Sequence, residues 1–555
     1  MLKNLLAVNL KKYYLLILAV VVAMFLIFAN LDARVFWADE AQTANVAATI
    51  LKYGLPTFFD GKNLIVDHPF DLDLNQYISD KLINYEKRRS EYKLTDYLWK
   101  WQPWLQHYLI ALGYLIFGIN TFAARFPFAA SGILVIIVLY FFVTKLFKNK
   151  ELADISLVLL IAFVPFYLYV RQARYYSLAM LFSILALYAY LKLIDDEKYS
   201  KFYFIFSNVI LFYSFYAAFF GIYSSIIIHA ILFNRNIKFI KRFIVASIPI
   251  FILTFPWFLY TSLFSKTYSF QMYHFIFGFF YLLSYVFLYM FPAILLVFVP
   301  FIIAYKKNNK IYFNSGHSLL LLAIFLSTLI ALFGPWDLPS FRYISFLIPF
   351  FIIEIAALMQ LIKKYSKLIF LTVFLLFIFT NFLFIFPFKF FESTGLKYVE
   401  KNSDEYYYIK ENLQIRYNFF DYIHEITHNY RGPNEVIVNF LRKNSKENET
   451  FITNADYAVY AFYTNMKFES DMNKNPDWVI LREPYFLWGG AEGEGSFLFN
   501  LTYKGYEKII FNSTDYIYLL DSPEPRKHRF KSNYKLELLD RYETYPITIY
   551  RKYDE

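Results

Sequence analysis

Six stretches of this sequence are apolar over a length that crosses, or nearly crosses, a lipid bilayer. A helix needs about 20 predominantly apolar residues to span the hydrocarbon core. The six stretches are 13–30, 122–147, 156–169, 175–194, 243–260 and 368–386, and further candidates lie at 202–217, 219–233, 276–304, 316–333 and 341–360. We therefore predict a polytopic α-helical membrane protein with about eleven transmembrane helices.

The composition supports this class and excludes others. The chain is 58% hydrophobic and 18% charged, whereas soluble domains carry about 25% charged residues. It has no cysteine, so a disulfide framework and a thiolate metal site are excluded. The first apolar run is long and no small-residue cleavage site follows it, so we interpret it as a signal anchor. Many of the lysines lie in short loops between apolar runs, and membrane topology explains the net charge of +11 better than nucleic-acid binding.

The basic loops predict an orientation, because short loops rich in Lys and Arg remain in the cytoplasm. These loops are 1–12, 145–151, 195–201, 234–242, 306–310 and 363–367. Their placement inside predicts a plasma (inner) membrane protein with a cytoplasmic N-terminus and an extracytoplasmic C-terminal domain. This orientation also requires that the apolar segment 104–119 does not cross the membrane. We expect an interfacial helix there, in the first external loop.

The composition changes near residue 386. We predict a transmembrane domain over 1–386 and an extracytoplasmic α/β or α+β domain over 387–555. The segments "DWVIL", "EKIIF", "YKLELL" and "PITIYR" have the pattern of strands.

An acid pair, Asp39-Glu40, stands where the first apolar run ends. Asp39 and Gln42 have capping-box spacing, so a helix N-cap is one interpretation. A catalytic carboxylate is the other, and the two do not exclude each other, because a helix start fixes the direction of a side chain. Gly54 and Pro56 predict the end of the helix that follows.

Arginines recur at membrane boundaries on the same predicted side: Arg125, Arg171, Arg174 and Arg342. Arginine beside hydrocarbon is costly unless it snorkels to the interface or has an anionic partner. Its planar donor fork suits phosphate. Each arginine alone is explained as an interfacial anchor, whereas the set favours a site for a membrane-embedded phosphate ester.

The order of these motifs resembles the GT-C glycosyltransferases, in particular the branch of the protein O-mannosyltransferases and the bacterial aminoarabinose transferase of lipid A. The resemblance rests on the acid pair, on 102–132, on "YVRQARYYSLAMLFSILALY", on "FRYISFLIP" and on the tail segment "ETFITNADYAVYAFYTNMKF". It implies an inverting transfer of a sugar from a polyprenyl-phosphate donor to a hydroxyl or phosphate of a protein, lipid or glycan acceptor.

The resemblance also implies roles for individual residues. Asp39 would be the base that takes the acceptor proton, and Glu40 would orient the acceptor or pair with an arginine. The donor phosphate would bind Arg171, Arg174, Arg342, Tyr175 and Tyr343. Other candidates for substrate binding are Lys100, Gln102, Arg125 and His68. The chain has "WQPW" where the family often has a histidine or lysine before two prolines.

Metal binding and other functions remain alternatives at this stage. Asp71 and Asp73 form a DxD pattern that is a weak candidate for a divalent ion. His424 and His428 match the short HExxH pattern of zinc peptidases. A multi-pass lipid or solute transporter, or a flippase, is the main alternative function. It predicts charged residues within the spans and helices broken by Gly or Pro.

Overall fold

The structure is a computed structural model. For the N-terminal part it describes residues 2–65, 97–100, 102–261, 315–332, 341–386 and 417–428, with short pieces between 276 and 295. For the C-terminal part it describes 432–481 with gaps, 505–514 and 546–553. The candidates His68, Asp71 and Asp73, and the predicted strand at 534–539, lie outside the described residues.

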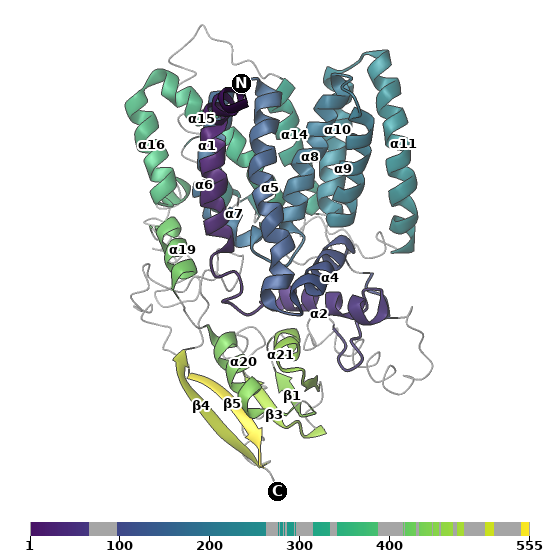
Figure 1. The fold of residues 1–555 in the computed structure, drawn as a ribbon, viewed down its shortest axis with the longest axis vertical. Helices are drawn as coiled ribbons and strands as arrows, with labels where there is room; N and C mark the ends of the chain where they lie inside the picture. Colours follow the sequence, from purple (N-terminus) through teal and green to yellow (C-terminus); the bar gives the residue numbers. More distant parts are fainter. Residues whose placement is uncertain are drawn as a thin grey trace.

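Apolar helices form one bundle (Figure 1). They are α1 (Leu2–Phe28), α5 (Thr121–Phe147), α6 (Lys150–Ala162), α7 (Val164–Val170), α8 (Tyr176–Ile194), α9 (Ser200–Ser214), α10 (Tyr216–Phe233), α11 (Ile237–Tyr260), α14 (Ser315–Ala331), α15 (Ile348–Tyr365) and α16 (Lys367–Phe379). Among the described residues, five helices are long and apolar enough to cross a membrane, or six if the bent pair α6–α7 is one span. The membrane class is thus confirmed, and the number eleven stays a prediction.

The predicted span at 156–169 is wrong as a single helix. It is divided at Phe163 into α6 and α7, which differ in direction by 69°. Pro165 lies in the first turn of α7. Its missing N–H is tolerated at this position, but a proline there prevents α6 from continuing as one uninterrupted helix. Because α7 is short, the Arg171–Arg174 turn follows directly after it.

Two helices, α2 (Ala38–Tyr53) and α4 (Leu105–Phe117), lie at one end of the bundle, with α2 across it (Figure 1). The N-cap of α2 is Trp37, and no side chain caps it. The interpretation of Asp39 as N-cap is therefore wrong, and Asp39 lies inside the first turn. Gly54 ends α2 in the left-handed conformation, with φ of 76°, as predicted.

The C-terminal part forms a mixed five-stranded sheet in the order β2-β1-β3-β5-β4. The strands are β1 (Thr450–Thr453), β2 (Lys467–Phe468), β3 (Trp478–Leu481), β4 (Tyr506–Thr514) and β5 (Pro546–Lys552), and three of them confirm the predictions "DWVIL", "EKIIF" and "PITIYR". β1 pairs in parallel with β2 and β3, whereas β5 runs antiparallel to β3 and β4.

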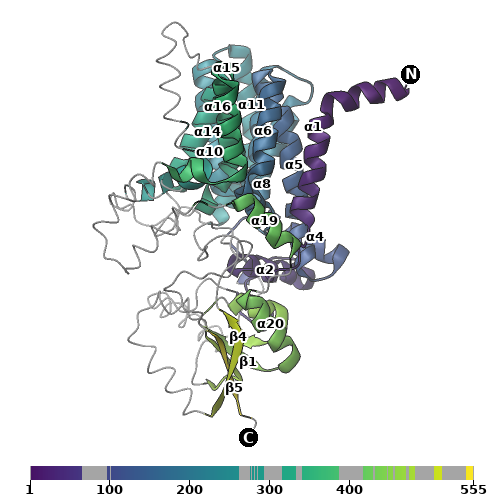
Figure 2. The same cartoon turned by 90° about the vertical axis from the view of Figure 1, so that its left-hand side faces the viewer.

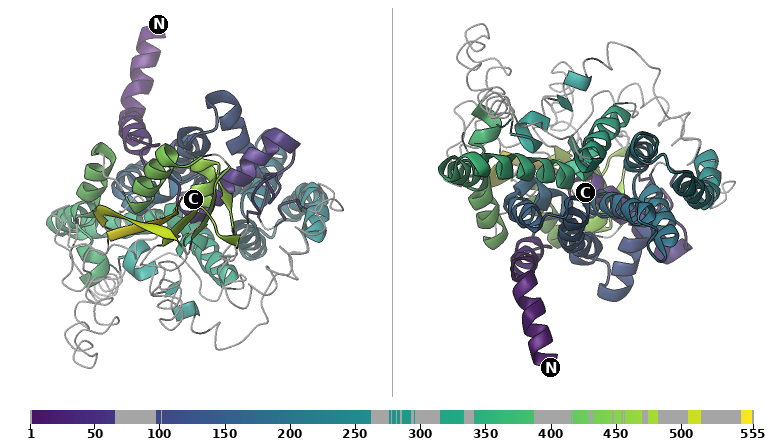
Figure 3. Two further views of the ribbon diagram at one scale, coloured as in Figure 1. Left: turned by 90° about the horizontal axis from the view of Figure 1, so that it is seen from below. Right: turned by 90° about the horizontal axis from the view of Figure 1, so that it is seen from above.

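Alternate residues of this sheet point to opposite faces, as the period of a strand requires. Trp478 and Ile480 belong to a core that also includes residues of α20 (Pro433–Asn444) and α21 (Tyr457–Thr464). Val479, between them in β3, belongs instead to a small hydrophobic cluster that contains no residue of α20 or α21. The larger core also contains residues of α2, α4 and α5, so the C-terminal part packs directly on these helices (Figures 2 and 3).

Candidate active site

The carboxylate of Asp39 lies between two arginines that come from distant parts of the chain. Its Oδ2 accepts from Nη2 of Arg174 at 3.0 Å and from Nη1 of Arg342 at 2.8 Å. Arg174 follows the short helix α7, and Arg342 lies in the 3-10 turn Phe341–Tyr343. The Asp39 side chain is 19% exposed, so this carboxylate remains accessible to a ligand.

Contacts to α2 and to Gln102, which precedes α4, fix the position of Arg174. Its Nη1 donates to the carbonyl of Asp39 at 3.1 Å and to Oγ1 of Thr43 at 2.8 Å. Oε1 of Gln102 lies 3.4 Å from the same nitrogen. Burial alone would lower the pKa of Arg174, but the charge of Asp39 outweighs it, and the pKa rises above its ordinary value. Arg174 therefore stays cationic.

Glu40, the neighbour of Asp39, has a different environment. It is fully buried and accepts from Nε and Nη2 of Arg125 at 2.9 and 2.7 Å. Its Oε1 also accepts from the backbone N–H of Ala173 at 2.7 Å. The bidentate pair links α2 to α5 and to the arginine turn, so Glu40 and Arg125 form part of the framework of the site.

Arg171 also has a framework position. Its Nη1 donates to the carbonyls of Leu26, Ile27 and Ala29, and its Nη2 donates to that of Asn30. These carbonyls belong to the end of α1 and the turn after it, where a helix leaves acceptors without intrahelical partners. Arg171 thus lies in the predicted cluster, but its guanidinium is directed to α1.

Aromatic side chains lie beside Arg174 and Arg342. The guanidinium of Arg174 lies 5.4 Å from the ring of Tyr175, and that of Arg342 lies 5.1 Å from the ring of Tyr343. The ring of Tyr175 stacks on Phe215, with centroids 4.3 Å apart. Burial raises the pKa of both tyrosines, that of Tyr175 to about 12. Both phenols are therefore neutral donors at physiological pH. The predicted residue Lys100 instead lies 4.4 Å from the ring of Tyr260.

Sequence reasoning missed three polar residues near Asp39. They are Thr43, Gln106 and His107. Gln106 accepts from the backbone N–H of Tyr175 at 3.1 Å and donates to Gln102 at 2.8 Å. A signal was present for Thr43, because it is four residues after Asp39 in α2, a spacing that places side chains on one helix face.

Some buried polar atoms in this region have no hydrogen-bond partner among the described residues. They are Nε of Arg174, the hydroxyl of Tyr176 and Nε2 of His107. Burial lowers the pKa of His107 to about 3, so its imidazole is neutral. Unsatisfied buried polar groups are uncommon in native proteins and call for a ligand or water. These atoms can form hydrogen bonds with ordered water or with a polar ligand.

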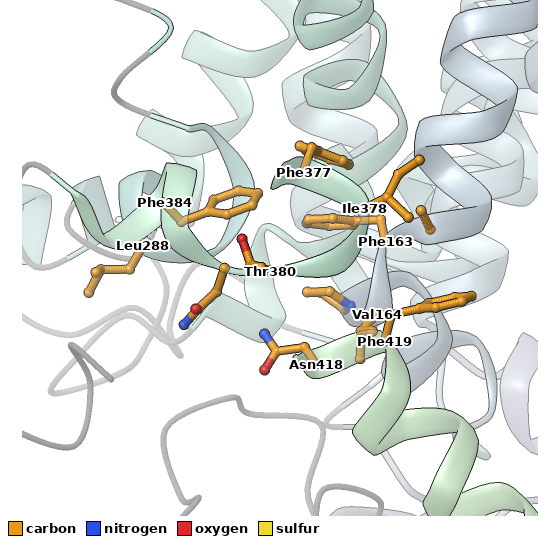
Figure 4. Close-up of a pocket in the computed structure, with 12 residues that line it drawn as sticks. Phe163, Val164, Leu288, Phe377, Ile378, Thr380, Phe384, Asn418 and Phe419 are labelled. Atoms are coloured by element: carbon orange, nitrogen blue, oxygen red, sulfur yellow. The ribbon is translucent and has the colours of Figure 1, made fainter. Parts of the chain in front are cut away.

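A separate pocket lies at the bend between α6 and α7 (Figure 4). Its space, open solvent included, is about 420 Å³. Phe163, Phe377, Phe384 and Phe419 form much of its lining, and the polar side chains are Thr380, Asn381 and Asn418. Its lining residues do not include Asp39, Arg174 or Arg342.

The HExxH match does not form a metal centre in the part of the chain that the structure describes. The rings of His424 and His428 stack with centroids 3.9 Å apart. Within the described residues, no group of three His, Cys, Asp or Glu side chains is arranged to hold a metal ion.

Comparisons with known proteins agree with this architecture. Residues 102–260 match the family model described as dolichyl-phosphate-mannose-protein mannosyltransferase. No curated protein sequence matches the chain. The apo crystal structure of ArnT from Cupriavidus metallidurans has 11% identity and a TM-score of 0.51, with 87% of this chain and 94% of that chain covered. At this identity, the likeness concerns the fold.

Two other solved structures are similar at lower TM-scores. ArnT from the same organism bound to undecaprenyl phosphate has 11% identity and a TM-score of 0.49, and the match covers 86% of this chain and 94% of that one. The Archaeoglobus fulgidus oligosaccharyltransferase in its apo form has 12% identity and a TM-score of 0.44, with 83% and 65% covered.

Proposed function

We propose that the chain is a GT-C glycosyltransferase that uses a polyprenyl-phosphate sugar as donor, because residues 102–260 match a glycosyltransferase family model and the chain is similar in fold to ArnT. The sugar is transferred with inversion to an acceptor hydroxyl or phosphate at the extracytoplasmic face of the plasma (inner) membrane. The family description, which names a dolichyl-phosphate sugar, supports a lipid-linked donor. A transporter is not favoured.

The observation that carries the proposal is the single carboxylate of Asp39 between Arg174 and Arg342. Two guanidinium charges against one carboxylate give the cluster a formal charge of +1. A phosphodiester-linked sugar carries one negative charge, so the bound donor neutralises the site. The buried atoms without partners, Nε of Arg174 and the hydroxyl of Tyr176, supply further donors for phosphate or sugar oxygens.

The charge stays balanced during the reaction. The acceptor oxygen attacks the anomeric carbon while its proton moves to Asp39, and the bond from that carbon to the phosphate oxygen breaks. The phosphate leaves with the bonding electrons and gains one negative charge, and Asp39 loses one by taking the proton. Fixed cations that stabilise a developing charge lower the barrier without any general acid. In this scheme Arg125, Arg171 and Glu40 hold the framework.

The donor phosphate also changes what Asp39 is able to do. In the donor-free protein both arginines donate to the carboxylate. When a phosphate takes over these donors, the carboxylate oxygen can accept a hydrogen bond from the acceptor hydroxyl.

The test uses purified protein in liposomes with a panel of labelled polyprenyl-phosphate sugars and a set of hydroxyl and phosphate acceptors. Wild type is compared with Asp39→Asn, and Asp32→Asn, an exposed acid in the preceding turn, is the matched control. We expect donor-dependent transfer by the wild type and the control only. Absence of transfer by the wild type with every donor would overturn the proposal.

A further inference from the structure

The three residues that lead into α2, Val35, Phe36 and Trp37, form no regular secondary structure. Backbone N–H and C=O groups in such a segment need partners from elsewhere in the protein. Here the membrane domain supplies the partners on the carbonyl side. Nη1 of Arg125 donates to the carbonyls of Leu31 and Arg34 at 2.9 Å, and its Nη2 donates to that of Val35 at 3.2 Å.

The C-terminal domain supplies the partners on the amide side. The N–H of Val35 donates to Oε1 of Glu435 at 2.8 Å, and the N–H of Phe36 donates to the hydroxyl of Tyr463 at 3.0 Å. The Tyr463 hydroxyl also bonds to Thr121 of α5 at 2.7 Å. Glu435 and Tyr463 lie 400 and 427 positions along the chain from Val35 and Phe36, respectively.

Aromatic contacts secure the same segment from both domains. The Phe36 ring is fully buried and packs on Phe462, with ring centroids 5.0 Å apart. The guanidinium of Arg125 lies 5.3 Å from the Phe36 ring. In α2 itself, the amide of Asn45 donates to the carbonyl of Ala458 in α21 at 2.9 Å. The start of α2 is thus held between the two domains.

We propose that Tyr463 and Glu435 are positioning residues for Asp39, so that the C-terminal domain is part of the catalytic apparatus. This inference rests on the proposed function. No side chain caps the start of α2, and the direction of its first turn is set by the contacts of Glu40 together with the segment that precedes it. Asp39 lies three residues after Phe36, and a shift of this turn moves its carboxylate relative to both arginines.

The test is Tyr463→Phe, which removes the hydroxyl that bonds to Phe36 and Thr121 but keeps the ring. The matched control is Tyr460→Phe, one turn earlier on α21, whose hydroxyl donates to Asn434 inside the C-terminal domain. We expect the kcat of Tyr463→Phe to fall about 10-fold, since small misplacements of a catalytic group are costly. KM for the donor stays within about two-fold, because the arginines are not altered.

A second readout does not depend on activity. Hydrogen exchange of the Phe36 amide becomes faster in Tyr463→Phe and is unchanged in Tyr460→Phe. Equal kcat and equal exchange in the two variants would overturn the proposal. If the wild type transfers no sugar, the proposed function fails, and the exchange comparison alone decides whether the C-terminal domain holds this segment.

A second pair of variants covers the case in which Tyr463→Phe does not fold. Glu435→Gln keeps an oxygen that accepts from Val35, whereas Glu435→Ala removes it. We expect Glu435→Gln to retain most of kcat and Glu435→Ala to lose it at an unchanged melting temperature. Equal kcat in these two variants would contradict the positioning role.

Discussion

Oδ2 of Asp39 lies 2.8 Å from Nη1 of Arg342, although 303 positions separate the two residues. Adjacent side chains on a helix point about 100° apart, and the neighbouring acids of α2 therefore have different environments. Asp39 faces Arg174 and Arg342 at an accessible position, whereas Glu40 is buried against Arg125. Of the two adjacent acids, Asp39 is thus the candidate base, and Glu40 forms a structural ion pair with Arg125.

Asp39→Asn should abolish transfer without loss of donor binding. The amide cannot take the acceptor proton, and general base catalysis contributes about 10²–10⁴-fold to a rate. Lipid-phosphate affinity should rise, because a competing carboxylate is removed from the two arginines. Turnover with labelled donor and titration with polyprenyl phosphate measure the two effects. A variant with normal turnover would exclude Asp39 as the base.

Arg342→Gln should weaken the binding of polyprenyl phosphate by about 10–100-fold, since hydrogen bonds to charged groups contribute about 1.5–3 kcal/mol. The matched control is Arg242→Gln. Arg242 pairs with the exposed Asp196, near the opposite end of α8. Titration in nanodiscs measures both affinities. Equal loss in the two variants would point to a general charge effect and against a phosphate site at Arg342.

Glu40→Gln should destabilise the protein by about 3–5 kcal/mol, because it leaves the buried Arg125 without its charged partner. The double variant Glu40→Gln with Arg125→Met should recover part of this loss. Thermal unfolding in detergent measures the stabilities. A Glu40→Gln protein that is as stable as wild type but inactive would instead assign Glu40 a direct part in the reaction.

His107 should make folding stability depend on pH. Burial lowers its pKa from 6.5 to about 3 in the folded protein, so the unfolded chain takes up a proton first as the pH falls. The stability from neutral His107 is complete above pH 6.5 and is lost between there and pH 3, by at most about 1.4 kcal/mol per pH unit. His107→Gln should reduce this slope. Identical slopes in wild type and variant would show that His107 does not titrate in this way.

The membrane class and much of the site could be predicted because they depend on local patterns. Apolar runs longer than a bilayer is thick have few alternatives to a spanning helix. The strands at 478–481, 506–514 and 546–552 had clear period-2 or β-branched patterns. Asp39, Arg174 and Arg342 were grouped because charged side chains at membrane boundaries are costly without partners; the fold brings the three together, and their roles stay predictions.

Other features depend on tertiary packing that no local pattern encodes. The capping-box spacing at Asp39 was misleading, because Trp37 starts α2 and the segment before it is held by Arg125 and the C-terminal domain. The arginines also look alike in sequence, and only the fold separates Arg171, which bonds to the end of α1, from Arg174. Tyr463 and Glu435 carried no signal, since their partners are backbone amides more than 300 residues away.

The most direct test of the account is a structure of the protein with a non-hydrolysable phosphonate analogue of the donor in nanodiscs. The account predicts that the phosphonate oxygens lie within hydrogen-bond distance of Arg174 and Arg342, with the anomeric carbon facing Asp39. A phosphonate bound elsewhere, with the three side chains still paired as in the donor-free protein, would contradict it.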